Sequence, residues 1–256
     1  MPVFADPPAL MGHRGFGKNA EGRPQENTAE SFRAAVDAGV DWIELDIRRT
    51  ADDELVLLHE AAWDDGTLVV THTAAELSQF GIITLDEALA AIPNDVGVNI
   101  EIKSSLEDAL VPPASSAAAL LCPVLEREHA HRPLLASSFE PTALQFIRSH
   151  VPDVAIGYIS WLGYPLDMAV VTAKRLGAEV LMGHVRSYAD PESPTRPSTE
   201  RVIEVALEAG LELGAWAPDA DEVADYAAAG IAVITVDDVP GGIAALGAER
   251  DAAATG

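Results

Sequence analysis

The stretch WIELDIR, residues 42–48, decides how the rest of the chain is interpreted. It is apolar enough to form a buried strand, and side chains alternate between the two faces of a strand. Its three aliphatic residues therefore share one face, whereas Glu44 and Asp46 share the other. Two neighbouring carboxylates repel each other unless a positive charge lies between them. The stretch therefore predicts a strand built around a cation rather than for stability alone.

Length and composition limit the class of protein. A chain of 256 residues has the usual size of one (β/α)8 barrel, and a hydrophobic content of 48% is typical of a globular protein. The only cysteine, Cys122, excludes an internal disulfide and a cysteine metal cluster. The sequence shows neither an apolar run that could span a bilayer nor a signal peptide at residues 1–6. We therefore expect a cytoplasmic protein without a membrane span.

The formal net charge of −25 argues against nucleic acid as a partner, because backbone phosphates are repelled. An anionic small-molecule substrate needs a local positive charge to enter such a protein. Two explanations of the charge stay open. One is life at high salt, where screening limits self-repulsion to roughly 3 Å at 1 M. The other is an ordinary acidic protein whose preference for arginine reflects genome composition.

Strand and helix patterns alternate along the chain. We expect a single (β/α)8 TIM barrel with a small insertion after the second strand, and a doubly wound open sheet is the alternative. Residues 1–246 form the expected domain, and 247–256 a frayed tail. The first helix is expected to begin after Asn27, with Glu30 completing a capping box, and to end at Gly39. The expected barrel strands are 10–12, 42–50, 96–103, 134–137, 154–158, 180–183, 212–216 and 232–236.

A hairpin follows the opening strand. Residues 51–54 form the expected turn, and 55–59 return as an antiparallel strand. If residue 50 lies opposite residue 55, His59 lies opposite Asp46. Residues 60–80 are then expected to form an irregular excursion over the barrel mouth.

In such barrels the functional site lies at the carboxyl ends of the strands. Unusual polar residues follow or end the first three strands: His13, Arg14, Glu44, Asp46, Glu101 and Lys103. Three converging carboxylates need a divalent cation, and all-oxygen ligation suits Mg²⁺ or Ca²⁺ better than zinc. The structural alternative is that Glu44 and Asp46 pair with Arg48 or Lys103.

Two histidines flank these acids in the expected arrangement. His13 and His59 can act as general base and general acid near neutral pH. Arg14 and Lys103 offer positive charge for a phosphoryl group.

Taken together, these residues resemble the glycerophosphodiester phosphodiesterase family. The resemblance rests on GHRG at 12–15, QENT at 25–28, IELD at 43–46, His59, EIK at 101–103, SSF at 137–139, Trp216 and ITVDD at 234–238. It implies a TIM barrel that hydrolyses glycerophosphodiesters to glycerol phosphate and an alcohol, with a bound Mg²⁺ or Ca²⁺. Such an enzyme belongs to lipid and glycerol metabolism.

The resemblance also implies residue roles. Carried over by position, His13 and His59 are the acid–base pair, Glu44, Asp46 and Glu101 are metal ligands, Arg14 and Lys103 are phosphate contacts, and Trp216 lines the glycerol or leaving-group side. Three departures stand out: Glu60 replaces an aspartate, residues 61–73 match the family poorly, and Trp216 is followed by Ala-Pro-Asp.

Other functions stay open on the same residues. The barrel could act as a lysophospholipase D-like or other phosphodiesterase, as a metal-dependent lyase or isomerase that uses Lys103 as its base, or as an inactive binding protein. The sequence leaves open the leaving alcohol, the choice between Mg²⁺ and Ca²⁺, a cyclic phosphate product, and the oligomeric state.

Overall fold

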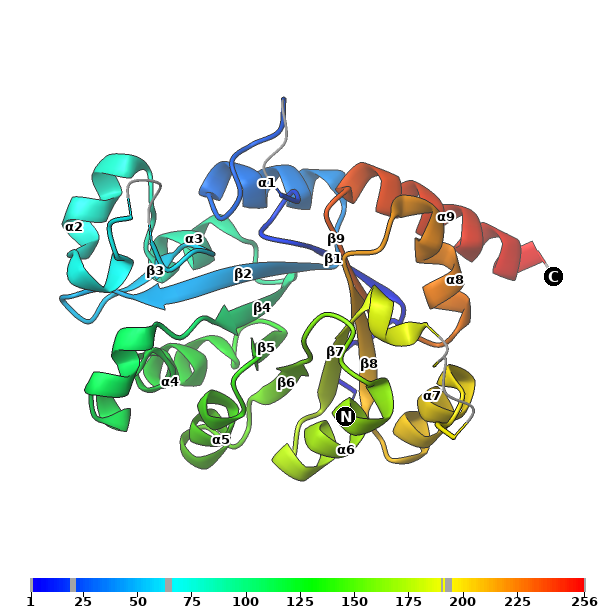
Figure 1. The fold of residues 1–256 in the computed structure, drawn as a ribbon. Coiled ribbons are helices and arrows are strands. Elements are labelled where there is room, and N and C mark those ends of the chain that lie inside the picture. The colour runs from blue at the N-terminus through cyan, green and yellow to red at the C-terminus, as the bar shows by residue number, and fades with distance from the viewer. Residues whose placement is uncertain (1, 19–21, 63–65, 190, 192–194, 256) are drawn as a thin grey trace.

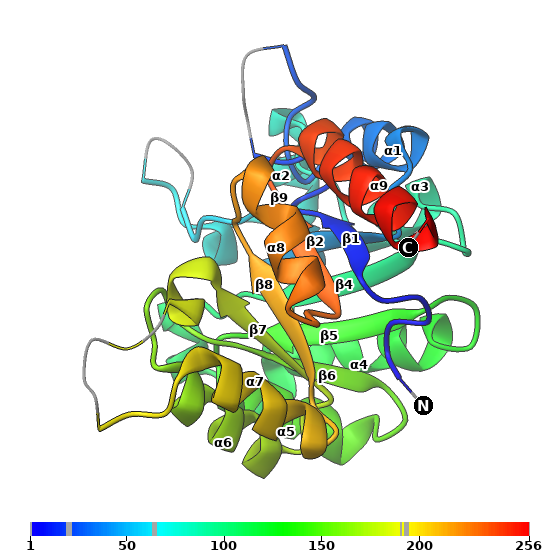
Figure 2. The ribbon, with the colours of Figure 1, turned by 90° about the vertical axis from the view of Figure 1, so that its right-hand side faces the viewer.

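The structure, a computed structural model, describes residues 2–255 apart from 19–21, 63–65, 190 and 192–194. It confirms the predicted barrel. Strands occupy the centre and helices form the layer around them (Figures 1 and 2). In the described part of the chain, the parallel strands of the barrel are β1 (Ala9–Gly12), β2 (Trp42–Arg49), β4 (Gly97–Ile102), β5 (Leu134–Ser138), β6 (Ala155–Ile159), β7 (Val180–His184), β8 (Glu212–Trp216) and β9 (Val233–Val236).

The pairing of β1 with both β9 and β2 closes the sheet. Met11 lies beside Thr235 on one side and beside Trp42 on the other. The remaining strands follow in the order β9-β8-β7-β6-β5-β4-β2, all parallel. Closure brings the carboxyl ends of all these strands to one mouth.

Helices fill the connections between the strands. They are α1 (Ala29–Ala38), α2 (Ala74–Leu77), α3 (Leu85–Ala91), α4 (Ala117–Glu128), α5 (Pro141–His150), α6 (Leu166–Leu176), α7 (Thr199–Glu208), α8 (Val223–Ala228) and α9 (Val239–Thr255). Short 3-10 turns lie at Val69–Thr71, Ser78–Phe80, Leu106–Leu110, Pro113–Ser115, Val185–Tyr188 and Ala220–Glu222. Helix α9 thus runs through residues 247–255, which the sequence analysis expected to be frayed, and the division of the chain at residue 246 stays a prediction.

The two faces of β2 separate as its alternation predicts. Ile43, Leu45 and Ile47 are fully buried in the main core between the strands and the outer helices, where Phe32 of α1 and Leu85 of α3 meet them. Their hydrophobic burial holds the helical layer on the barrel. Glu44 and Asp46 consequently face the barrel interior.

The amino-terminal end of the barrel is closed by apolar side chains. Trp42, at the start of β2, meets the fully buried Phe4 edge to face at a centroid distance of 5.0 Å. A Cβ on Gly97 would lie 2.2 Å from the Trp42 indole, so the neighbouring strand needs glycine there. The Glu212 carboxylate accepts hydrogen bonds from the backbone N–H groups of Val3 and Phe4. This end is therefore sealed, and the interior opens at the mouth.

The prediction of Asn27 as the N-cap of α1 is wrong. Thr28 is the N-cap, because its hydroxyl accepts a hydrogen bond from the backbone N–H of Ser31. Asn27 has a positive φ of 55°, and its side-chain amide donates a hydrogen bond to Asp46 instead of capping the helix. The helix ends at the left-handed Gly39, as predicted.

The predicted hairpin register is wrong by one residue. The returning strand β3 (Leu55–Leu57) pairs Leu55 with Arg49, so Leu58 and not His59 lies opposite Asp46. The backbone N–H of Leu58 donates to the Asp46 carbonyl at 3.2 Å, and His59 lies just beyond the paired region. The excursion after it contains α2 as well as turns, and lies with β3 beside the carboxyl end of β2 (Figure 1).

None of the helices in the described part of the chain has the length and apolar character that crossing a bilayer requires.

Candidate active site

Three carboxylates gather at the mouth of the barrel because β2 and β4 are in register. Asp46 lies directly beside Glu101, and Glu44 lies beside Asn99. One oxygen from each of Glu44, Asp46 and Glu101 lies within 4.8 Å of the other two. All three side chains are buried, with Asp46 fully so. The structure thus brings together the three acids that the sequence singled out, and the arrangement can hold a cation.

The β1–α1 loop holds these acids from one side. Asn27 donates from its amide to Oδ2 of Asp46 at 2.9 Å and accepts from the Asp46 backbone N–H at 3.1 Å. The backbone N–H of Arg14 donates to Oε2 of Glu44 at 2.8 Å. Both Arg14 and Asn27 have left-handed backbone angles, with φ of 53° and 55°. Such angles are uncommon for residues other than glycine and mark a loop whose shape the site dictates.

The acids differ in protonation because their surroundings differ. Burial, followed by the nearby charges of Asp46 and Glu101, raises the pKa of Glu44 well above its ordinary value. Burial and the charge of Asp46 raise the pKa of Glu101 to about 7, although Lys103 opposes this. Burial would also raise the pKa of Asp46, but Lys103 and Arg14 outweigh it and the pKa is lowered. Three buried carboxylates are therefore in excess of the local positive charge.

Two cations partly balance the cluster. The Lys103 ammonium contacts Glu101 and lies 3.3 Å from Oδ1 of Asp46. Nε of Arg14 lies 3.3 Å from Oδ2 of Asp46, and its Nη1 donates to Glu26 at 2.7 Å. Burial lowers the pKa of Lys103, but Glu101 and Asp46 outweigh it and the pKa is raised. Lys103 is thus a fixed positive charge at neutral pH.

His13 is oriented by an acid from the far end of the chain. Its Nδ1 lies 2.5 Å from Oδ1 of Asp237, which follows β9, and its Nε2 lies 3.9 Å from Oε2 of Glu44. A carboxylate can only accept, so the proton of a neutral His13 belongs on Nδ1 and Nε2 faces the acids. Burial would raise the pKa of Asp237, but His13 and Lys18 outweigh it and the pKa is lowered.

His59 has the same kind of partner. Its Nδ1 lies 2.6 Å from Oε1 of Glu60, so the glutamate that departs from the family pattern still orients the ring. Burial lowers the pKa of His59, and the charge of Asp46 only partly opposes it. His59 therefore tends toward the neutral imidazole, with Nε2 available for proton transfer.

A cavity of about 100 Å³ brings the predicted residues together. Its lining includes all of them except Asp46, which lies beneath the other acids with no exposed surface: His13, Arg14, Glu44, His59, Glu101, Lys103 and Trp216. Trp216 packs edge to face against Phe139 at 6.0 Å and against His184 at 4.3 Å, and its indole N–H has no hydrogen-bond partner among the described residues.

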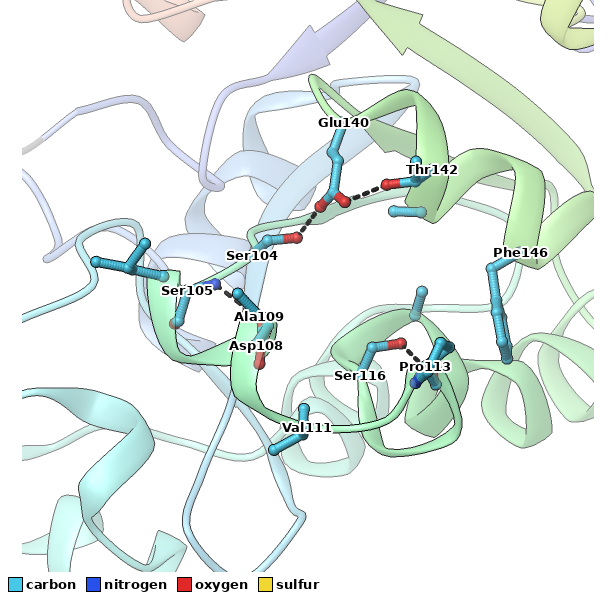
Figure 3. Close-up of a pocket in the computed structure, with 13 residues that line it drawn as sticks. Ser104, Ser105, Asp108, Ala109, Val111, Pro113, Ser116, Glu140, Thr142 and Phe146 are labelled. Atoms are coloured by element: carbon cyan, nitrogen blue, oxygen red, sulfur yellow. Dashed lines mark hydrogen bonds between the residues drawn. The ribbon is translucent and has the colours of Figure 1, made fainter.

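A larger hollow of about 460 Å³ contains none of the predicted site residues. Figure 3 shows its lining from the β4–α4 connection and from the start of α5. Glu140 accepts hydrogen bonds there from the hydroxyls of Ser104 and Thr142 (Figure 3).

The sequence missed several residues of the cavity. Lys18 lines the cavity, and its Nζ lies 3.2 Å from Oδ2 of Asp237, the carboxylate that orients His13. The rule that polar residues after barrel strands form the site could have found Asp237, which directly follows β9. Nothing in the sequence distinguishes Lys18, whose position depends on how the β1–α1 loop folds. Asn99, which lines the cavity and lies beside Glu44 in the sheet, is a further residue to which the sequence gave no role.

The closed parallel barrel, with acids, histidines and cations at the carboxyl ends of its strands, has the arrangement of a (β/α)8-barrel enzyme. The family model described as "Glycerophosphoryl diester phosphodiesterase family" matches residues 13–240. The chain therefore belongs to this family. Membership identifies it as an enzyme of the glycerophosphodiester phosphodiesterase type.

Individual relatives agree with this. The chain is 30% identical over 181 residues to the glycerophosphodiester phosphodiesterase of Caldanaerobacter subterraneus, covering 63% of this chain and 71% of the relative. It is 29% identical over 233 residues to the probable glycerophosphodiester phosphodiesterase 2 of Mycobacterium tuberculosis, covering 83% and 80%.

Solved structures have the same fold. A phosphodiesterase of Oleispira antarctica, solved with its product sn-glycerol-3-phosphate, superposes with a TM-score of 0.75 at 25% identity and covers 94% of this chain and 97% of its own. A glycerophosphodiester phosphodiesterase of Thermotoga maritima superposes with a TM-score of 0.71 at 22% identity, covering 91% and 95%.

Proposed function

We propose that this protein hydrolyses glycerophosphodiesters to glycerol phosphate and an alcohol, using one divalent cation and a pair of histidines. The observation that carries the proposal is the convergence of three buried carboxylates and two acid-oriented imidazoles in one cavity. Family membership and the glycerol phosphate product of the Oleispira relative support the substrate class.

The residues fit a divalent cation. Oε1 of Glu44 and both side-chain polar atoms of Asn99 are buried without hydrogen-bond partners in the described part of the chain. Buried polar atoms seldom stay unpaired, and the raised pKa values of Glu44 and Glu101 indicate excess negative charge. Glu44, Asp46 and Glu101 are the ligands in this proposal. A cation bound there would supply Lewis-acid stabilisation of the phosphodiester charge. Mg²⁺ and Ca²⁺ both suit the oxygen ligands.

The two histidines then divide the proton transfers. One imidazole removes the proton from the nucleophile, either water or the glycerol 2-hydroxyl, and the other gives a proton to the leaving alcohol as its P–O bond breaks. Attack by water gives glycerol phosphate directly, whereas attack by the 2-hydroxyl gives a cyclic phosphate that a water molecule must then open. His13 and His59 suit these tasks because Asp237 and Glu60 hold their Nδ1 protons, which leaves each Nε2 without a hydrogen-bond partner among the described residues.

Arg14 and Lys103 hold the phosphoryl group in this proposal, and Trp216 lines the glycerol or leaving-group side. Their charges offset the repulsion that a net charge of −25 imposes on an anionic substrate. The raised pKa of Lys103 argues against the lyase alternative, because a base that removes a carbon-bound proton must be neutral.

The test is turnover of a panel of glycerophosphodiesters and lysophospholipids with Mg²⁺, Ca²⁺ or a chelator, measured by release of glycerol phosphate. We expect turnover that the chelator abolishes and that His13→Ala and His59→Ala each lower by roughly 10²–10⁴-fold. Glu54→Gln is the matched control, because Glu54 is an exposed acid in the β2–β3 turn. Absence of turnover with every metal contradicts the proposal, and full activity of both histidine variants contradicts its mechanism.

A further inference from the structure

Arg48 is a buried cation to which the proposed mechanism assigns no role. It lies near the carboxyl end of β2 on the same face as Glu44 and Asp46, and its side chain is 7% exposed. Among the described residues, no carboxylate oxygen comes within 4.0 Å of its guanidinium. It does not line the cavity either. Nearby carboxylates, first Asp46 and then Glu60, favour its charge but do not touch it, so the contacts of this buried arginine need an explanation.

The guanidinium instead holds two backbone carbonyls. Nε and Nη2 of Arg48 donate to the carbonyl oxygen of His59 at 3.0 and 2.5 Å, and Nη1 donates to the carbonyl oxygen of Ser104 at 3.3 Å. The planar fork suits this double donation, which a lysine ammonium cannot reproduce.

These carbonyls lie where the segments that follow β3 and β4, the two strands beside β2, leave the sheet. On one side, the last backbone bond to β2 runs from the Leu58 N–H to the Asp46 carbonyl, at 3.2 Å. On the other side, the Lys103 N–H donates to the Ile47 carbonyl at 3.1 Å. His59 and Ser104 each follow directly after these residues. Arg48 thus replaces the missing sheet hydrogen bonds on both flanks of the strand.

We propose that Arg48 is a positioning residue that fixes His59 and Lys103 on either side of the acid cluster. It holds the His59 backbone directly, and it holds Lys103 through the adjacent Ser104. This inference rests on the proposed function for the importance of those two side chains. Displacement of a reacting group by about 1 Å can cost roughly 10²-fold in rate, so such an anchor affects chemistry without touching substrate.

Arg49 provides the matched control. It is equally buried, at 7%, and also holds the β4–α4 connection, through Asp108 at 3.0 Å. Among the described residues its guanidinium contacts carboxylates, Asp108 and, at 3.6 Å, Asp53, and not the His59 carbonyl. Loss of Arg49 therefore removes a similar buried cation and a similar loop contact, without releasing the histidine.

The experiment compares Arg48→Met, Arg48→Lys and Arg49→Met by steady-state kinetics on a glycerophosphodiester, with thermal unfolding to confirm folding. We expect Arg48→Met to lower kcat about 10–100-fold with little change in KM. Arg48→Lys should lie between it and the wild type. Arg49→Met should keep kcat within about 3-fold of the wild type. Equal losses in the Arg48→Met and Arg49→Met variants would overturn the inference.

A double-mutant cycle with His59→Ala separates positioning from general stabilisation. If Arg48 acts mainly through His59, most of the loss caused by Arg48→Met disappears when His59 is already alanine. The same fold loss in both backgrounds contradicts this role.

A measurement that does not depend on enzyme activity tests this inference separately from the proposed function. The chain contains 7 histidines, so His59→Ala can assign the His59 imidazole signals in an NMR spectrum. Those signals should move in Arg48→Met and stay in place in Arg49→Met. Unmoved signals in Arg48→Met overturn the positioning role even if the wild type is active. Moved signals without phosphodiester turnover leave the positioning intact and contradict the proposed function.

Discussion

At the scale of single residues, the acid cluster controls how the protein responds to pH. Glu44 and Glu101 have raised pKa values because they are buried beside other carboxylates. Asp46 has a lowered pKa because Lys103 and Arg14 outweigh the effect of burial. Neighbouring acids on the same two strands therefore influence stability in opposite directions.

We expect the metal-free protein to be more stable near pH 5.5 than near pH 8. A carboxyl group whose pKa is raised on folding stabilises the fold below its unfolded pKa, and that contribution is lost as the pH rises through the folded value, about 7 for Glu101. The thermal unfolding temperature should fall by several degrees between these pH values, since 1 kcal/mol corresponds to about 2–4 °C in a domain of this size. Calorimetry on chelator-treated protein measures this.

Glu101→Gln is the control for that experiment, because it removes the titrating group and relieves the repulsion on Glu44. The variant should lose much of the pH difference, and Mg²⁺ or Ca²⁺ should raise the unfolding temperature of the wild type at pH 8. An equal pH difference in wild type and variant would show that other groups cause it.

We expect Asp237→Asn to reduce kcat roughly 10- to 100-fold, part of the 10²–10⁴-fold that a positioned acid or base contributes. The amide no longer selects the Nδ1–H form of His13, which Asp237 contacts at 2.5 Å. Asp238→Asn is the matched control, because Asp238 is a more exposed neighbour that pairs with Arg23. The measurement is kcat for both variants, and similar losses in the two would contradict an orienting role for Asp237.

At the scale of elements, two adjacent residues at the start of α1 have different structural roles. Thr28 caps the helix, and Asn27 bridges the loop to Asp46. N-cap preferences rank asparagine above threonine, so they favour the wrong residue here, and only the contact of Asn27 with β2 explains why Thr28 is the cap. The predicted pairing of β2 with β3 was wrong by one residue for a similar reason. The geometry of the turn, and not the hydrophobic pattern, sets which residues of the two strands lie opposite each other.

We expect substitutions at these two positions to have different effects. Thr28→Ala removes the cap and should cost about 1 kcal/mol of stability with activity retained. Asn27→Gly keeps the left-handed backbone accessible but removes both contacts to Asp46, so it should lower activity by much more than it lowers stability. Chemical denaturation and kinetics on both variants test this, and the reverse pattern would mean that Asn27 serves the helix.

At the scale of the whole molecule, self-repulsion opposes the compact state. The net charge of −25 lies on a fold of 256 residues, and screening shortens the reach of charge from about 10 Å at 0.1 M salt to about 3 Å at 1 M. The site itself is less exposed to this effect, because its charges are buried and paired at short range.

We therefore expect the thermal unfolding temperature to rise between low salt and molar KCl at pH 7.5. The rise should shrink near pH 4.4, which is the sequence isoelectric point, because the net charge is then close to zero. Calorimetry at the two pH values measures the difference. An unfolding temperature that is independent of KCl at pH 7.5 would contradict a protein adapted to high salt.

The alternation of strands and helices, the two faces of β2, and the acids, histidines and cations at the strand ends all follow from the amino-acid sequence. These are local properties, since hydrophobic periodicity and residue type depend only on nearby positions. Three contacts become visible only in the folded barrel: Asp237 orients His13 across 224 positions, Asn27 binds Asp46, and Arg48 binds the His59 carbonyl. Such contacts depend on barrel closure and on loop conformation, which bring distant residues together without any local signal.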